Sequence, residues 1–253
     1  MRKRHYIIIA VLSYLVLLVA TIPARPVVDL ISKNAPVNIQ GVSGTLWSGK
    51  ALLINTSNNI KIDKTEWSFR PWKLFLGDVA AEINAEFLGN DISAELGTSF
   101  LGRFFVNDLY AKVSAQQAAE LAKLPLVQLS GTISLAIESA QWKQGEPPLA
   151  DGEIRWTDAA VTIAETASLG NVTIILSESD QQQLYADIKN QGGDIRVNGN
   201  AELLPAKKYA LDIKLLPAAS ASNNIKQSLG MFAQRQNNGE YVLKKSGSLE
   251  QIM

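Results

Sequence analysis

Hydrophobic residues follow two different patterns along this chain. From Tyr6 to Ile22 they form a run without a charge, and beyond Pro26 many of them alternate with polar residues at every second position. A continuous apolar run is typical of a helix that crosses a membrane, whereas alternation with a period of two is typical of a half-buried strand. The pattern therefore predicts one apolar helix followed by a β-rich domain.

The apolar run is predicted to be a membrane anchor. A helix over this run would be about 26 Å long, at the short end of what crosses a hydrocarbon core. Because the run is longer than the apolar core of most signal peptides, a retained anchor is favoured over a cleaved signal. A buried core helix is disfavoured by the basic residues before the run and by Pro23 and Pro26 after it. The predicted anchor residues are Tyr6, Ile7, Ile8, Ile9, Val11, Leu12, Tyr14, Leu15, Val16, Leu17, Leu18, Val19 and Ile22.

The orientation of the anchor is predicted from its charged flanks. Arg2, Lys3 and Arg4 precede the run, whereas Arg25 and Lys33 follow it with Asp29 between them. Basic residues beside a membrane span resist translocation and stay in the cytoplasm. The short N-terminus is therefore predicted to be cytoplasmic, with the large remainder on the other side of the membrane.

The alternating segments predict a mainly β fold. Strands that recur at about ten-residue spacing, with turn residues between them, favour an elongated antiparallel sheet or sandwich. Two short helices are also predicted: 115–124, with Ser114 as N-cap and Pro125 as stop, and Ser222–Phe232. The predicted strands are 59–69, 79–87, 103–113, 126–137, 153–163, 172–176, 184–188, 194–203 and 209–215.

The predicted domain organisation is simple. Residues 1–25 form the cytoplasmic tip and the anchor, and residues 26–253 form the β-rich domain. The loop at 144–148, rich in Gly and Pro, divides this domain into two halves, 26–143 and 149–253, which resemble each other weakly.

Composition removes several classes of chemistry. The chain has 24 basic and 24 acidic residues, so it offers no electrostatic footprint for nucleic acid. It contains no cysteine, and its only histidine, His5, lies before the apolar run. The exported part therefore lacks the residues for disulfides, for Ser-His-Asp or Cys-His catalysis, and for histidine-ligated zinc. We predict no catalytic, cofactor or metal site, and hence no enzyme.

Two aromatic strings stand out. The segment 41–51 places Trp47 between glycines, without the spacing or the following helix that a phosphate-binding loop needs. A sheet corner with a core aromatic is the favoured interpretation. The segment 67–74 combines two tryptophans with Arg70, Pro71 and Lys73. One interpretation of this segment is a contact with the membrane surface or with a partner. The favoured interpretation is a strand that ends at Pro71 and packs its tryptophans on the sheet.

The order of these strings resembles the N protein family of the bacterial type II (general) secretion pathway. The resemblance covers essentially the whole chain and, more distantly, extends to AsmA-like β-sheet envelope proteins. It implies a single-pass inner-membrane component of the secretion machinery, with a periplasmic β-domain, no cofactor and no catalytic activity. The residues that carry it include Gly44, Thr45, Leu46, Trp47, Ser48, Gly49, Trp67, Pro71, Trp72, Gly152, Trp156, Gly170, Gly193 and Gly199.

Two functions from different classes remain open at this point. The first is an interaction protein that contacts other secretion components at the inner membrane through exposed strand edges. The alternative is a lipid-binding or lipid-transfer module, with Trp67, Trp142 and Trp156 lining an apolar groove of the sheet. A continuous apolar channel along the sheet would favour the second.

Overall fold

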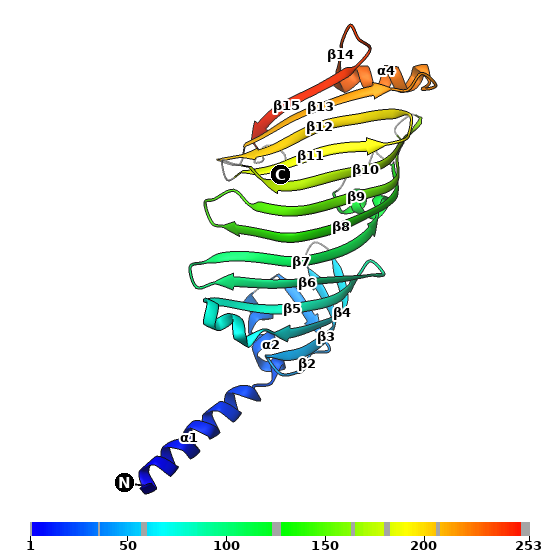
Figure 1. The fold of residues 1–253 in the computed structure, drawn as a ribbon. Coiled ribbons are helices and arrows are strands. Elements are labelled where there is room, and N and C mark those ends of the chain that lie inside the picture. Colours follow the sequence, from blue (N-terminus) through cyan, green and yellow to red (C-terminus); the bar gives the residue numbers. More distant parts are fainter. Residues whose placement is uncertain are drawn as a thin grey trace. The chain divides into compact units, whose positions relative to one another are not determined.

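The computed structural model describes residues 2–34, 36–56, 60–122, 128–162, 165–179, 183–205 and 208–248. The chain divides into two compact units, residues 1–96 and 97–253. Both are built mainly from antiparallel strands (Figure 1), as the alternating pattern predicts.

The first unit begins with two helices, α1 (Arg2–Ala20) and α2 (Ala24–Asn34). The apolar side chains of α1 from Tyr6 to Val19 are 46–69% exposed. The helix α2 was not predicted, because Pro23 and Pro26 were interpreted as helix stops. Pro26 instead lies in the first turn of α2, where a missing backbone N–H leaves no hydrogen bond unmade.

No helix in the part of the chain that the structure describes is long and apolar enough to cross a membrane.

The sheet of the first unit has the strand order β1-β3-β4-β5-β6, and the short β2 pairs with β3. The 3₁₀ helix η1 (Pro71–Leu76) connects β4 to β5, and β6 runs across the division between the two units. The bounds are β1 Val37–Gln40, β2 Ser43–Gly44, β3 Ser48–Thr56, β4 Lys61–Phe69, β5 Asp78–Phe87 and β6 Asn90–Ser99.

The sheet of the second unit is an antiparallel meander in which each strand from β7 to β13 pairs with the next one along the chain. The strand β15 then pairs with β13, and the two-residue β14 pairs with β15. The bounds are β7 Arg103–Ser114, β8 Gln128–Lys143, β9 Leu149–Thr162, β10 Thr166–Glu178, β11 Leu184–Gln191, β12 Ile195–Leu204, β13 Lys208–Pro217, β14 Gln234–Arg235 and β15 Tyr241–Ser248.

Register gives this second sheet two faces of opposite character. The strand pairing places apolar residues opposite one another in a row that continues from β7 to β15, and we call this side the apolar face. The neighbouring row, one residue along each strand, is polar, and we call that side the polar face. The apolar row is Ala111, Leu135, Ile154, Ile174, Ile188, Gly199, Ile213 and Leu243; the polar row is Lys112, Ser134, Arg155, Thr173, Lys189, Asn198 and Lys214.

The apolar row is half-buried, although the described strands place no second sheet over it. Of the two predicted architectures, a sheet or a sandwich, the second unit therefore forms the sheet.

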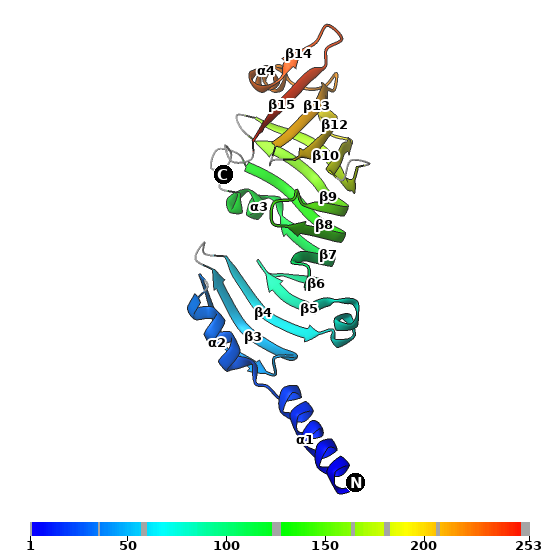
Figure 2. The ribbon, with the colours of Figure 1, turned by 90° about the vertical axis from the view of Figure 1, so that its left-hand side faces the viewer.

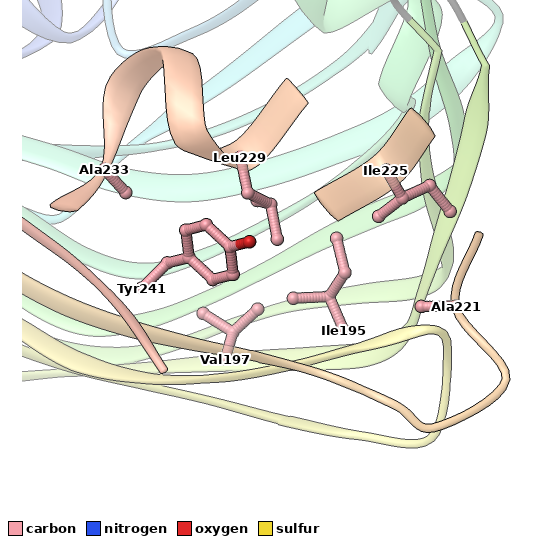
Figure 3. Packing of buried hydrophobic residues seen from close by; sticks show 7 residues of the cluster. All are labelled: Ile195, Val197, Ala221, Ile225, Leu229, Ala233 and Tyr241. Atoms are coloured by element: carbon pink, nitrogen blue, oxygen red, sulfur yellow. The ribbon is translucent and has the colours of Figure 1, made fainter. Parts of the chain in front are cut away.

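The helix α4 (Asn223–Phe232) packs on one end of the apolar face. Its Ile225 and Leu229 point toward Ile195 and Val197 of β12 and toward Tyr241 of β15 (Figure 3). All five side chains are buried, and they form the core cluster of this unit together with Ala221 and Ala233. Ser222 caps the helix, since its Oγ accepts a hydrogen bond from the backbone N–H of Ile225 at 3.1 Å.

The helix α3 (Ala115–Leu121) lies beside β7 and β8 (Figure 2). Ser114 is its N-cap, as predicted, and Gln117 completes a capping box with it. Ala115 and Ala119 are buried. The predicted end at 124 and the stop at Pro125 lie outside the described residues.

Each predicted strand contains or overlaps a strand of the structure, whereas β1, β2, β3, β6, β14 and β15 were not predicted. Residues 59, 126–127 and 163 of the predicted strands lie outside the described residues. The loop at 144–148 joins β8 to β9, which pair with each other inside the second unit. The weak similarity of the two halves around this loop stays a prediction.

Candidate functional site

The first candidate site is a tight turn between β2 and β3 formed by the string Gly44 to Gly49. The backbone N–H of Thr45 donates to the carbonyl of Ser48 at 2.8 Å, and the N–H of Ser48 donates to Thr45 Oγ1 at 3.1 Å. These bonds close the turn and leave Leu46 and Trp47 at its tip. The turn therefore presents one backbone donor and one indole donor to whatever lies beside it.

The neighbour of this turn is the end of α1. Trp47 Nε1 donates to the carbonyl of Val19 at 2.7 Å, and the N–H of Leu46 donates to the carbonyl of Ile22 at 2.9 Å. Thr45 also forms an isolated β-bridge with Pro23. The last carbonyls of a helix lack partners inside the helix, so donors from elsewhere stabilise its end. We call this set of contacts the helix–sheet junction.

Two aromatic residues of β4, Trp67 and Phe69, contact the residues of the helix–sheet junction. Trp67 Nε1 donates to the carbonyl of Leu46 at 3.1 Å, and the ring centroid of Phe69 lies 4.9 Å from that of Trp47. A Cβ on Gly49 would lie 2.4 Å from the Trp67 ring, so only glycine permits this close packing. The strings around Trp47 and Trp67, which the resemblance singled out separately, thus meet in one structure.

Pro71 and Trp72 have different surroundings. Pro71 begins η1, where its fixed φ suits the first turn. Trp72 is 52% exposed, unlike Trp67, which is half-buried. The aromatic string 67–74 therefore splits into a packed part on the sheet and an exposed part on η1.

Two glycines that the resemblance singled out, Gly170 and Gly193, lie in contact in the second unit. Gly170 belongs to β10, and Gly193 belongs to the Gly192-Gly193 turn. A Cβ on Gly193 would lie 2.5 Å from the carbonyl oxygen of Ser168 and 2.7 Å from the nitrogen of Gly170. Gly170 and Gly193 have φ values of 69° and 80°, which favour glycine. This contact joins β10 to the turn between β11 and β12.

Sequence reasoning missed the two polar residues that hold this contact. Asn190 Nδ2 donates to the carbonyls of Leu169 and Ile195 at 2.6 and 2.7 Å, and Asn190 Oδ1 accepts from the N–H of Val197 at 2.7 Å. Asp194 Oδ2 accepts from the N–H of Ser168 at 2.9 Å. The available signal was their position on either side of two consecutive glycines, where short polar side chains commonly bond to the backbone.

The remaining predicted residues lie in the second sheet. Trp156 shares a strand-pairing row with Ile133 and Val172, on the apolar face, and its Nε1 donates to the carbonyl of Ser130 at 2.8 Å. Gly152 and Gly199 lie where neighbouring backbones approach closely, since a Cβ would come within 2.5 and 2.3 Å of a carbonyl oxygen.

The three tryptophans proposed to line one groove are not brought together. Trp67 belongs to the first unit, while Trp142 and Trp156 belong to the second. Trp142 stacks on Phe104 at 5.7 Å, opposite it on β7. The pairing row of Trp156 lies on the apolar face.

The second candidate site is an apolar cavity of about 260 Å³ between α4 and the apolar face. Ser222 Oγ donates to Glu165 Oε2 at 2.7 Å, so the start of α4 is tied to the carboxylate at the cavity. The lining is otherwise almost wholly aliphatic and includes Leu169, Val197, Ile213, Leu215, Leu229 and Leu243. A surface of this kind suits an acyl chain or a hydrophobic side chain of a partner.

The polar face carries ion pairs rather than a reactive site. Arg155 makes a bidentate pair with Glu153 at 2.6 and 2.7 Å, and the hydrogen bond raises the pKa of Arg155. Lys189 Nζ lies 2.5 Å from Asp187 Oδ2, and this hydrogen bond raises the pKa of Lys189. Within the described ranges, no three acidic or histidine side chains lie together in a way that would hold a metal ion.

Comparison with known proteins identifies close matches along nearly the full chain. A family model described as "Type II secretion system (T2SS), protein N" matches residues 35–244. The chain is 27% identical over 251 residues to "Type II secretion system protein N" of Aeromonas hydrophila, which covers 94% of this chain and 95% of that protein. It is 24% identical over 243 residues to the protein of the same name from Vibrio cholerae, with 91% and 92% covered. No solved structure matches the chain.

Proposed function

This chain belongs to the type II secretion system protein N family, and we propose that it serves that system as a membrane-anchored, non-enzymatic binding component. The observation that carries the proposal is the family match over residues 35–244. It spans residues of both units, and it includes the turn around Trp47 and most of the second sheet.

The proposed location is the inner membrane, with α1 as a single-pass anchor and both sheets in the periplasm. Support comes from the exposed apolar side chains of α1 and from Arg2, Lys3 and Arg4 in front of them. An apolar segment near the lower length limit is accommodated by bilayer thinning and by flanking residues that reach the interface. The residues Tyr6 to Val19 and Ile22 would then contact lipid.

The proposed contacts with other secretion components use strand edges. The strand β14 pairs only with Tyr241 and Val242 of β15, so in the described chain the edge of β15 beyond Val242 has no neighbouring strand. In the first unit β1 pairs on one side with β3 and has no described strand on the other. An open edge accepts a strand from a partner through backbone hydrogen bonds.

In-cell photo-crosslinking would test these edges. A photoreactive residue at Leu243 or Lys245 of β15 is expected to capture another component of the secretion machinery. The matched control is the same residue at Asn198, which lies on the polar face away from the edge. Capture of phospholipid alone at the edge positions, or equal protein capture at Asn198, would contradict the proposal.

A second candidate function, lipid binding, is favoured by one observation. The apolar row on β7–β15 is unbroken by charge, is half-buried although no described strand lies over it, and leads to the cavity beneath α4. Acyl chains bind to continuous apolar surfaces of this kind because burial of both surfaces removes them from water.

Co-purified lipid would test this second function. Ala201 lies two residues from Gly199 on β12 and shares the apolar face, whereas its neighbour Asn200 points to the polar face. If the face binds acyl chains, Ala201→Phe should fill it and lower the phospholipid that native mass spectrometry detects on the full chain. Asn200→Phe is the matched control and should leave bound phospholipid unchanged. Absence of phospholipid from the wild-type chain would exclude the function.

A further inference from the structure

We propose that the η1 tip, which consists of Trp72, Leu74, Phe75 and Leu76, inserts into the surface of the bilayer that holds α1. The inference rests on the proposed anchoring of α1. It adds a second, peripheral membrane contact that would fix how the first sheet stands on the membrane.

The first support is exposure. Phe75 is 92% exposed, Leu76 69%, Trp72 52% and Leu74 41%, and no residue of η1 is buried. Scattered single hydrophobic residues are ordinary on a surface, but four within five consecutive residues form a patch. In water the apolar surface of this patch stays exposed to solvent, whereas insertion into the bilayer interface would remove that surface from water.

The second support is the arrangement of charge. Lys73 is the one charged residue of η1, and its Nζ pairs with Glu95 of β6 while lying 5.3 Å from the Trp72 ring centroid. Its side chain is only 15% exposed. Arg70, just before η1, pairs with Glu82 of β5. Both cations are thus neutralised and held toward the sheet, and the tip itself is apolar.

The third support is the shape of the segment. The N–H of Lys73 donates to the carbonyl of Arg70, and the N–H of Gly77 donates to the carbonyl of Leu74, both at 3.1 Å. Gly77 ends the helix in the left-handed conformation with φ 84°. The tip is therefore a short turn with backbone hydrogen bonds at both of its ends, and each satisfied backbone group lowers the penalty for entering a membrane interface.

The fourth support is continuity with α1. Phe69, two residues before η1, donates its N–H to the carbonyl of Trp47 at 2.7 Å, and Trp47 in turn binds the end of α1 at Val19. If α1 crosses the bilayer, its end at Ala20 marks the membrane surface. The strand end that leads into η1 lies against that same junction. Tryptophan and short apolar segments are favoured at this level of a bilayer.

A protein partner is the other conceivable occupant, and the size of the patch argues against it. Stable protein interfaces use about 20–30 residues on each side, and the tip offers four side chains on one short turn. A bilayer needs no such area because the anchor already holds the chain at the surface. The occupant we infer is therefore lipid.

Depth-dependent fluorescence quenching on the full chain would test the inference. The chain has no cysteine, so single cysteines can be labelled with an environment-sensitive fluorophore without other changes. We would label Phe75→Cys, with Met231→Cys as control, because Met231 is also highly exposed at 81% but lies outside the η1 tip. The chain would be reconstituted in phosphatidylethanolamine–phosphatidylglycerol vesicles that carry quenchers at shallow or deep positions.

The expected result is strong quenching at position 75 by the shallow quencher and none at position 231. An unquenched probe at 75 would overturn the inference. A probe at 75 that becomes shielded only when other secretion components are added would also overturn it, in favour of a protein contact. Leu12→Cys in α1 separates this failure from failure of the anchor, since deep quenching at 12 with none at 75 leaves the anchor intact.

A second experiment removes the apolar tip while leaving the fold unchanged. With the probe at Leu74→Cys, the double substitution Phe75→Ser and Leu76→Ser should reduce shallow quenching at least about twofold, because the lost apolar surface weakens insertion. Met231→Ser in the same labelled background is the matched control and should change nothing. Unchanged quenching in the double variant would overturn the inference.

Discussion

The two units use their hydrophobic residues in different ways. In the first unit, aromatic residues make directed contacts: Trp47 and Trp67 donate hydrogen bonds at the helix–sheet junction, and Phe69 packs beside them. In the second, aliphatic residues form a continuous row, and α4 buries one end of it. A directed bond specifies one geometry, whereas an aliphatic surface accepts any apolar group of suitable shape. The first unit is therefore suited to attachment, and the second to binding or self-packing.

The largest expected effect tests the second unit. Leu229→Ala removes a buried side chain between α4 and the sheet and should destabilise the second unit by about 2–5 kcal/mol, through lost burial and the cavity left behind. Denaturant unfolding followed by fluorescence would measure it. Met231→Ala, on the exposed side of the same helix, should stay within about 0.5 kcal/mol of the wild type. Equal effects of the two would show that α4 is not packed on the apolar face.

The next effect tests how rigid the first unit is at its junction. Gly49→Ala places a Cβ against the Trp67 ring and the carbonyl oxygen of Ser43, so overpacking should destabilise the first unit by about 1–3 kcal/mol. In contrast, Gly230→Ala adds a methyl group to α4 with only one atom within 4 Å, at 3.9 Å, and should stabilise it by about 0.5–1 kcal/mol. Thermal unfolding would measure both. A tolerated Gly49→Ala would mean that the turn adjusts and that the junction is less specific than its bonds imply.

A smaller effect isolates the directed bond itself. Trp47→Phe keeps an aromatic ring beside Phe69 but removes the N–H that binds the carbonyl of Val19, a loss of about 1 kcal/mol. Hydrogen exchange of the backbone N–H groups of Thr21 and Ile22 should become faster by about fivefold, as expected for that free energy. Trp142→Phe, where a tryptophan stacks on Phe104, is the control and should leave the exchange at Thr21 and Ile22 unchanged.

The smallest effect concerns the polar face. Lys189→Gln removes the ion pair with Asp187, and because the pair is exposed to solvent we expect no measurable change in the free energy of unfolding at neutral pH. The raised pKa of Lys189 has a sign that can be checked. Its contribution is fully present below the pKa of a free lysine and disappears only as the pH rises through the higher folded value. A measurable difference between wild type and variant at neutral pH that stays constant as the pH rises through the folded pKa of Lys189 would contradict this assignment.

Much of the β fold could be predicted from the sequence because strand alternation is a local signal. The N-cap at Ser114 was predicted as well, since a cap depends on residues three positions apart. The helix predicted from Ser222 is capped by that residue, a role that was not predicted. The missed strands have local reasons. In β6 the alternation is weak, and β15 ends in the polar and small residues from Lys244 to Ser248. The helix α2 was missed because proline was treated as a stop where it occupies a first turn.

The candidate site was less predictable than the strands. The sequence drew attention to Trp47, Trp67 and the paired glycines, but it gave no indication that Trp47 would bind the end of α1 or that Gly170 would contact Gly193. It grouped Trp67 with Trp72, which the structure separates into a packed and an exposed residue. It also overlooked Asn190, whose four side-chain hydrogen bonds join β10, the glycine turn and β12.

By itself the sequence determined most of the extended segments, the apolar side of those strands, and an apolar helix near the N-terminus of a chain without cysteine. Those properties depend on neighbours two to four positions away. Only the tertiary structure decided that Val19 meets Trp47, that Leu46 meets Trp67, and that apolar rows from successive strands join into one face. These contacts depend on strand register and on turns that bring distant residues together. A local sequence pattern does not determine which of the possible contacts has the lowest free energy.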